Sequence, residues 1–419
     1  MGSLTSLAEE ILANAKRLDQ HLSSQHLSAT SFDHDSLADL PSELESTRKA
    51  LIDSTQTLKQ LSQGPVGSSM EIIFNWTDLL SLRVIYEFKL SQAVPIEGST
   101  TYQDISIKSG LPEPLVRRFM RHAMGNHIFA EASPDSVRHT AASRMMVTDP
   151  DFFDAVGLEA SELAPTAGRV IEALKRYGDS GEPNESAFSL ANETAVSMYQ
   201  FLGQHPERAR RFGSGMRFFT KGESWDLKHL ASGFDWASVD RPGATVVDVG
   251  GNNGSVSQFL ARSTRHITFI VQDLPGTVEQ GRASLPAEFQ GRIEFMAHDF
   301  FTEQTLQSPP NIYLFRWIMH NWSDPYCVKM LQNLSPTMRH GSRILIYEYV
   351  LEDTPETRLT EKMGPNLDMI MAACFNSAER TRADWLRLLD KADGRFWLHN
   401  ISRPEGSTMS VIEVLWKAV

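Results

Sequence analysis

The chain has 419 residues, of which 41% are hydrophobic and 22% charged, values typical of a soluble globular protein with a sizeable core. Its 40 Lys and Arg residues against 52 Asp and Glu residues give a net charge of −12. This balance argues against a dedicated nucleic-acid binder, which needs a basic face. The two cysteines are too few for a disulfide framework or a four-ligand zinc site, so we expect a reducing compartment such as the cytoplasm.

The N-terminus gives no reason to expect a membrane partner. No apolar run reaches the length of about 18 residues that a transmembrane helix needs, and no secretory signal is visible. The first six residues, 1–6, fit the loose pattern for myristoylation, but a pattern of this length often matches by chance.

Residues 1–65 are expected to form an N-terminal helical segment, because leucines recur there at heptad spacing. The stripe comprises Leu37, Leu40, Leu44, Leu51, Leu58 and Leu61, with Thr47 and Ser54 as weaker members. Such a stripe packs either on its own domain or on a partner subunit, and we favour the partner. Gly64 and Pro65 then break the helix and mark a boundary.

Residues 66–175 have the pattern of a winged-helix-like dimerisation domain. Residues 105–111 and 114–120 suggest a helix, a turn and a second helix, and residues 128–131 and 137–140 suggest two short strands. The arginines of the second helix are more typical of a solvated face than of a DNA contact on so acidic a chain. They are Arg117, Arg118 and Arg121.

Residues 176–419 follow a polar loop at 176–186 and alternate short apolar runs with helix-length segments, which predicts a doubly wound, parallel α/β sheet. The expected strands lie at 246–249, 267–271, 293–296, 312–315, 344–347 and 410–416.

A glycine-rich turn after the first of these strands is the strongest sign of a cofactor site. The segment 246–254 reads Val-Val-Asp-Val-Gly-Gly-Asn-Asn-Gly, and its glycines let the backbone approach a ligand closely. Asp273 and Asp299 follow the next two strands. The carboxyl ends of adjacent parallel strands line one crevice, so we expect these acids to converge on the turn. Asp273 would be placed to accept hydrogen bonds from the hydroxyl groups of a ribose.

The segment after the fourth strand makes a specific resemblance. Together with the glycine turn, Asp273-Leu274-Pro275, the run His320-Asn321-Trp322-Ser323-Asp324, Glu348 and Glu379-Arg380-Thr381 resemble the plant and fungal O-methyltransferases of the caffeic-acid type, in order and spacing over residues 70–419. This resemblance implies a Rossmann-like domain that binds S-adenosylmethionine, and a homodimer.

The resemblance also implies roles for individual residues. His320 would be the catalytic base, oriented by Glu348 and Glu379, and no metal is expected. The cofactor site would comprise Asp248, Gly250, Gly251, Gly254, Asp273, Leu274, Asp299, Phe300, Arg316 and Trp322. The chemistry is coherent, because a neutral imidazole can remove a phenol proton while a carboxylate fixes its tautomer.

The substrate side departs from the family pattern. Where the family often has an asparagine in the phenol pocket, the chain reads Met-Ala-Ala-Cys-Phe at 371–375, so the substrate is expected to differ in shape and polarity. An apolar pocket could be lined by Phe218, Phe219, Met369, Met371 and Phe375, although such clusters are often plain core.

Three functions remain open. The first is O-methyl transfer to a phenol or enol of a secondary metabolite. The second is a pericyclase or dehydratase of fungal polyketide (pyridone-type) biosynthesis, which keeps the bound cofactor as a fixed charge while His320, Arg316 or Lys329 polarises a carbonyl. The third, a non-catalytic winged-helix regulator, would need a basic recognition surface.

Overall fold

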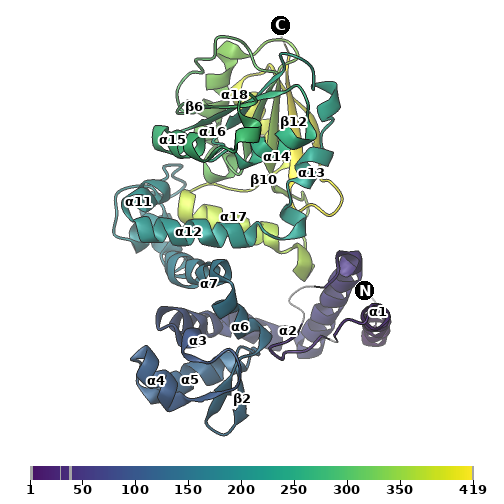
Figure 1. Ribbon diagram of the computed structural model, residues 1–419, viewed down its shortest axis with the longest axis vertical. Coiled ribbons are helices and arrows are strands. Elements are labelled where there is room, and N and C mark those ends of the chain that lie inside the picture. Colours follow the sequence, from purple (N-terminus) through teal and green to yellow (C-terminus); the bar gives the residue numbers. More distant parts are fainter. Residues whose placement is uncertain (1–2, 29, 37–39, 418–419) are drawn as a thin grey trace. The chain divides into compact units, whose positions relative to one another are not determined.

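The computed structural model describes residues 3–28, 30–36 and 40–417, and the chain divides into two compact units. The first consists of Met1–Gly168, Leu202–Phe219 and Thr357–Lys362, and the second of Arg169–Phe201, Thr220–Glu356 and Met363–Val419. The first unit is largely helical and the second is built on a sheet (Figure 1).

The sheet of the second unit has seven strands in the order β11-β12-β8-β7-β4-β5-β6. The strands from β8 to β6 run parallel, while β12 is antiparallel to both β8 and β11. This arrangement confirms the predicted α/β class. The strands are β4 (Thr245–Val249), β5 (Thr268–Asp273), β6 (Ile293–Ala297), β7 (Ile312–Arg316), β8 (Arg343–Glu348), β11 (Phe396–Ser402) and β12 (Ser410–Trp416).

Six of these strands match the predicted ones, and β11 was not predicted. Only Phe396 and Leu398 of its seven residues are buried, and its partner β12 covers one side only. An edge strand needs little apolar character, which explains why the sequence pattern did not reveal it.

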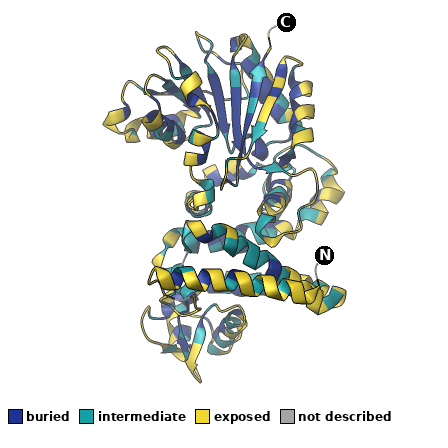
Figure 2. Ribbon diagram, turned by 90° about the vertical axis from the view of Figure 1, so that its right-hand side faces the viewer, coloured by how far each residue is buried: buried dark blue, intermediate teal, exposed yellow. Residues whose placement is uncertain are grey.

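Helices cover both faces of the sheet, because successive strand residues point to opposite sides. Val246 packs with Leu260 of α14 (Ser255–Ser263) on one face. Its neighbour Val247 packs on the other face with Leu331 of α16 (Asp324–Leu334) and Leu388 of α18 (Arg382–Ala392). The strands are accordingly buried along most of their length (Figure 2).

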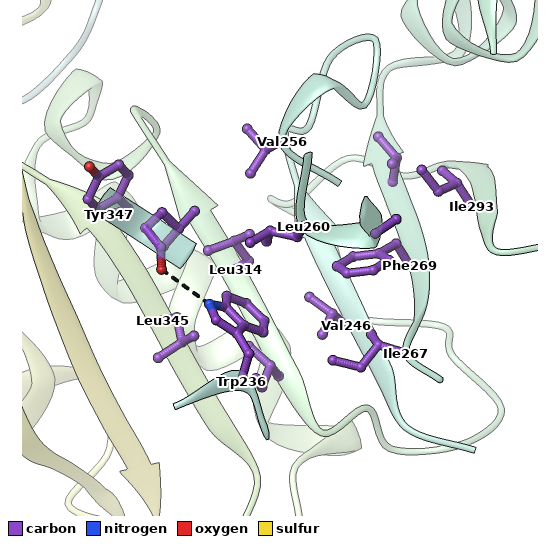
Figure 3. Close-up of a cluster of buried hydrophobic side chains, with 14 of the residues drawn as sticks. Trp236, Val246, Val256, Leu260, Ile267, Phe269, Ile293, Leu314, Leu345 and Tyr347 are labelled. Atoms are coloured by element: carbon purple, nitrogen blue, oxygen red, sulfur yellow. Dashed lines mark hydrogen bonds between the residues drawn. The ribbon is translucent and has the colours of Figure 1, made fainter. Parts of the chain in front are cut away.

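The first of the two clusters is shown in Figure 3, where Leu260 and Phe269 lie between strand and helix. Trp236 closes the cluster, and its indole Nε1 donates a hydrogen bond of 3.1 Å to the carbonyl oxygen of Leu230. A buried indole N–H needs such a partner, so this bond fixes the approach of the chain to β4.

The remaining elements of the second unit are short or peripheral. They are α9 (Val170–Tyr177), α10 (Ala187–Ala191), η3 (Glu223–Trp225), α13 (Lys228–Ser232), η4 (Trp236–Ser238), α15 (Pro275–Ser284), η5 (Ala287–Phe289), η6 (Met319–Asn321), η7 (Ser335–Thr337), β9 (Val350–Leu351), α17 (Met363–Phe375) and β10 (Arg380–Thr381). The chain passes from the second unit to the first within α11 (Met198–Gln204).

The strand order fixes where a ligand site belongs. From β4 the chain proceeds to β5 on one side, and the fourth strand, β7, returns to the other side of β4. The strand order changes direction between β4 and β7, and in such sheets ligands are expected to bind at the carboxyl edge beside this point. Both predicted motifs, the glycine turn and the segment around His320, lie in the loops after these two strands.

The first unit contains the predicted helix, turn and helix as α4 (Tyr102–Ser109) and α5 (Glu113–Met124), followed by a small sheet of order β1-β3-β2. Its core gathers Ile85, Tyr102, Ile105, Val116, Met120 and Phe129. The elements are α1 (Leu4–Ser24), η1 (Ser42–Leu44), α2 (Glu45–Glu87), α3 (Leu90–Ala93), β1 (Thr100–Thr101), β2 (Ala130–Ser133), β3 (Ser136–Arg138), α6 (Ala141–Thr148), α7 (Pro150–Gly157), the π-helix η2 (Leu158–Leu163), α8 (Ala164–Ala167), α12 (Pro206–Phe219) and η8 (Leu359–Glu361).

The predicted break near residue 64 is a sharp bend within α2. Gly64 has φ 68°, and Lys59 pairs with Glu71 at 2.6 Å although twelve residues separate them. A straight helix would hold such residues about 18 Å apart, so the chain folds back here.

The leucine stripe is only partly helical. Leu37 lies outside the described residues, Leu40 and Leu44 precede α2, and Leu51 is half-buried. Because α1 packs along α2, the stripe has a partner within its own chain.

The compact units do not follow the three predicted ranges, since α12 and residues 357–362 join the first unit. Thr360 explains the second of these, because its hydroxyl donates to Asp53 Oδ2 at 2.7 Å and its N–H donates to Oδ1 at 3.0 Å. The division at residues 65 and 175 stays a prediction.

Helix α15 offers a matched test of core packing. At Gly281 a Cβ would lie 2.3 Å from Phe295 Cε1, whereas at Gly276 it would meet nothing within 4 Å. We expect Gly281→Ala to lower the free energy of unfolding by about 1–3 kcal/mol, since overpacking outweighs the helix propensity of alanine. Gly276→Ala should leave the urea midpoint unchanged or raise it, and an equal loss in both variants would contradict the packing argument.

Candidate active site

The glycine turn after β4 adopts a backbone that favours glycine. Gly250, Asn252 and Gly254 have φ values of 69°, 51° and 74°. A Cβ at Gly250 would lie 2.5 Å from Ile318 Cδ1, in the loop after β7, and one at Gly251 would lie 2.7 Å from Asp248 Cγ. The turn therefore packs tightly against the loop after β7, and a side chain is excluded at Gly250 and Gly251.

Asp273 closes this turn from the end of β5. Its Oδ2 accepts the N–H of Asn252 at 2.9 Å, and its Oδ1 accepts the N–H of Leu274 at 2.8 Å. The end of β6 is hydrogen-bonded to the end of β5, because the N–H of His298 donates to the Asp273 carbonyl oxygen at 3.0 Å. The structure thus brings Asp273 next to the turn, as predicted, while Leu274 is largely exposed beside it.

Asp299 lies one residue beyond His298 and caps its own loop, since its Oδ1 accepts the N–H of Phe301 at 2.9 Å. Phe300 and Phe301 form an aromatic cluster with Trp322, with ring centroids 6.0 Å and 4.6 Å from the indole. Phe300 also approaches the glycine turn, 3.9 Å from the position of a Cβ on Gly250. Phe300 and Trp322, two of the predicted cofactor residues, therefore lie together, and Phe300 also lies near Gly250.

A buried carboxyl group and a partly buried guanidinium group interact at the ends of β4 and β7. Burial raises the pKa of Asp248 to about 6, against the hydrogen bond that Ser257 Oγ donates to it at 2.7 Å and the nearby charge of Arg316. Burial also lowers the pKa of Arg316, and its Nε has no hydrogen-bond partner among the described residues. Such an orphaned donor at the end of β7 is suited to an anionic or polar ligand group.

His320 and Glu379 form a direct buried pair. His320 Nδ1 lies 2.7 Å from Glu379 Oε1, and the two side chains are 6% and 0% exposed. Because a carboxylate only accepts, Nδ1 carries the proton, and in the neutral ring Nε2 keeps the lone pair. Within the described part of the chain, Nε2 makes no hydrogen bond.

Glu348 holds the loop rather than the ring. It ends β8, is fully buried, and its Oε1 accepts the backbone N–H groups of Ile318, Met319 and His320 at 2.9, 2.6 and 3.3 Å. The predicted flanking acid is therefore present, and it acts on the backbone that carries His320.

These acids also set the protonation of the imidazole. Burial alone would lower the pKa of His320, but the hydrogen bond and charge of Glu379, together with the charge of Glu348, raise it above the ordinary value of 6.5. Burial raises the pKa of Glu348 as well. His320 is therefore a stronger base than a free imidazole and gains its proton at a higher pH.

The candidate substrate residues are divided between the two units. Met371 and Phe375 are buried, with Phe375 5.3 Å from Tyr199, whereas Met369 is 64% exposed on the same helix, α17. Phe218 and Phe219 end α12 in the first unit, where Phe218 packs against Phe152 at 4.9 Å. The pocket assignment of these five residues stays a prediction.

Three residues near His320 were not singled out from the sequence. Ser377 Oγ donates to the His320 carbonyl oxygen at 2.6 Å, and Arg380 Nη1 donates to the Met319 carbonyl oxygen at 3.0 Å. Asp368 Oδ1 accepts the N–H of Glu379 at 2.9 Å. Only Arg380, which directly follows Glu379, had a sequence signal.

None of the helices in the described ranges is both long and apolar enough to cross a bilayer. The same residues contain no group of three or more histidine, cysteine or acidic side chains placed to hold a metal ion.

Comparison with known proteins agrees with this geometry. An O-methyltransferase domain is matched over residues 184–394. The chain is 34% identical over 418 residues to the chlorophenol O-methyltransferase of Trichoderma longibrachiatum, covering 98% of this chain and 89% of that protein. The solved structure of OxaC with sinefungin and meleagrin is similar at a TM-score of 0.78 and 24% identity, over 99% of both chains.

LepI in complex with SAM is similar at a TM-score of 0.72 and 19% identity, over 98% of this chain and 100% of that one. At this identity the likeness shows the fold alone, whereas the whole-length relative and the matched domain show the family. The chain belongs to the O-methyltransferase family, whose cofactor is S-adenosylmethionine.

Proposed function

We propose that the protein methylates a phenolic or enolic hydroxyl of a secondary metabolite, with His320 as the general base. The buried contact of 2.7 Å between His320 Nδ1 and Glu379 Oε1 carries this proposal, because it leaves Nε2 as the proton acceptor.

The carboxyl ends of β4, β5 and β7 carry groups that suit the cofactor. No side chain fits at Gly250 or Gly251, the Asp273 carboxylate lies beside this turn, and the buried Nε of Arg316 has no hydrogen-bond partner among the described residues. We infer that Asp273 binds the ribose hydroxyls, that Asp299, Phe300 and Trp322 bind the adenine, and that Arg316 faces the amino-acid end. When bound, S-adenosylmethionine supplies the methyl group that the substrate oxygen attacks.

The chain's own part in the reaction is to hold and move one proton. Neutral His320 accepts the proton of the substrate hydroxyl at Nε2 while Glu379 stabilises the imidazolium that forms. Glu348 keeps residues 318–320 in place through three N–H groups. Correct placement of the hydroxyl supplies the remaining rate enhancement.

A phenolic substrate is supported by two observations. The relative at 34% identity is described as a chlorophenol O-methyltransferase, and another, at 35% identity, belongs to the grayanic acid biosynthesis cluster of Cladonia grayi. Met369 is exposed on α17 beside residues expected to face the substrate, and methionine adapts well to aromatic rings.

A pericyclic reaction without methyl transfer is the second candidate. The same fold occurs in a protein described as a pericyclic reaction enzyme, at a TM-score of 0.73 and 19% identity. The buried charge of Arg316 would suit carbonyl polarisation there.

We also propose a homodimer formed through α2. Beyond the bend at Gly64, this helix exposes seven large apolar side chains, an unusual concentration for a monomer. They are Val66, Met70, Ile72, Ile73, Phe74, Trp76 and Leu80. This exposed segment replaces the leucine stripe as the candidate interface, because α1 already packs along α2 and, of the stripe leucines within α2, Leu51 and Leu58 are half-buried while Leu61 is exposed.

We further propose that the winged-helix-like part within residues 66–175 belongs to this dimerisation region, and that the protein works in the cytoplasm. Both cysteines, Cys327 and Cys374, are buried and form no disulfide, which suits a reducing compartment.

The first prediction for function concerns the fate of the methyl group. With methyl-labelled S-adenosylmethionine and a panel of phenols and pyridone alcohols, mass spectrometry should find label in a product and one S-adenosylhomocysteine per product. His320→Ala should lower kcat by about 10²–10⁴-fold while cofactor binding, measured by calorimetry, persists. Conversion by loss of water or isomerisation, with no label gained, would support the pericyclic candidate instead.

The second concerns pH. Since Glu379 helps raise the pKa of His320 above 6.5, kcat should rise with pH through a midpoint above 6.5 and fall below it as the imidazole becomes protonated. Glu379→Gln keeps the shape but removes the charge, so it should move this midpoint to lower pH. If the midpoint of the kcat profile is unchanged in Glu379→Gln, Glu379 does not raise the pKa of the group that titrates.

The third concerns the apolar face of α2. Trp76→Asp should convert the dimer to monomer in sizing chromatography with light scattering, because the ring is 63% exposed and free of core contacts. Leu58→Asp on the half-buried stripe serves as a comparison. If Trp76→Asp elutes as the wild type does, this face is not the interface.

A further inference from the structure

The segment 377–380 is hydrogen-bonded to the loop that carries His320. Ser377 Oγ donates to the His320 carbonyl oxygen at 2.6 Å, and Glu379 Oε1 accepts from the ring. The buried Arg380 guanidinium donates to the Met319 carbonyl oxygen at 3.0 Å. The position of the ring therefore depends on whatever holds this segment.

Helix α17 holds it from the opposite side. Asp368 Oδ1 accepts the backbone N–H of Glu379 at 2.9 Å, and the Met371 carbonyl oxygen accepts the N–H of Ser377 at 3.3 Å. The first of these bonds involves a side chain, and a carboxylate binds an N–H more strongly than a neutral acceptor does.

The Glu379 side chain has little other support. It is wholly buried, and its second carboxylate oxygen, Oε2, has no hydrogen-bond partner among the described residues. Its one polar side-chain contact in that part of the chain is His320, so the backbone must set the angle and distance of the Oε1 contact. Asp368 fixes that backbone at the residue itself.

We propose that Asp368 is a positioning residue for the His320–Glu379 pair. It does not touch the imidazole; it acts through the main chain of Glu379. The proposal rests on the proposed function in assigning the pair a role in catalysis, whereas the positioning is a property of the pair and can be measured without turnover.

The charged groups around His320 and Glu379 determine the pKa of His320, which the experiment below measures. Glu379 and Glu348 raise the pKa of His320 and Arg380 lowers it. Asp368 itself faces Glu379, Asp384 and Arg380, and burial raises its pKa. Loss of Asp368 would loosen the Oε1 contact and so lower the pKa of His320.

The test follows the His320 ring by NMR in histidine-labelled protein, with the signal assigned by its absence in His320→Gln. Asp368→Ala should lower the titration midpoint of His320 by on the order of one pH unit, toward the value in Glu379→Gln. Asp368→Asn, which keeps an acceptor oxygen, should retain most of the wild-type midpoint. Asn366→Ala, an exposed position of the same helix, is the matched control and should change nothing.

Turnover provides the second readout. Asp368→Ala should lower kcat about 10-fold, with KM for the cofactor unchanged, since a misplaced base costs rate rather than cofactor affinity. If Asp368→Ala does not fold, Asp368→Ser, whose hydroxyl is too short to reach the N–H, takes its place. A folded variant with an unshifted His320 midpoint overturns the proposal even if methyl transfer is established. A shifted midpoint in a protein that transfers no methyl group upholds the positioning and removes the proposed function.

Discussion

One buried carboxylate, Glu348, determines whether the site can exist. It stands at the end of β8, where the sheet fixes its backbone, and it accepts three consecutive N–H groups of the loop after β7. Those N–H groups would otherwise be buried without partners, at a cost of about 1–3 kcal/mol each. The loop conformation, and with it the direction of His320, follows from this arrangement.

The glycine turn after β4 and the surroundings of His320 after β7 have different physical requirements. Gly250 and Gly251 must remain without side chains, because a Cβ there would lie too close to Ile318 and Asp248. The region of His320 must instead be dense and dry, so that the charge of Glu379 acts at full strength on the imidazole. The switch in strand order between β4 and β7 places both requirements at the same edge of the sheet.

A raised pKa at His320 has two opposing consequences. The stronger base removes a phenolic proton more readily, but a larger fraction of the protein carries a protonated imidazole at neutral pH. Because phenols are weak acids, a stronger base increases the rate at which their proton is removed. The buried acids are therefore part of the substrate preference that we propose, and Asp368 is the residue through which α17 maintains them.

The sequence alone determined the α/β class, six of the seven sheet strands, the helix pair of the first unit and the residues at the strand ends, because periodicity and turn residues are local properties. The resemblance in turn selected His320, Glu348 and Glu379. Only the tertiary structure decided that Glu348 binds backbone while Glu379 binds the ring, that Asp368 accepts the N–H of Glu379, and that α2 packs against α1. These are contacts between segments far apart in the chain, and they depend on the direction of each side chain in three dimensions, which local spacing does not encode.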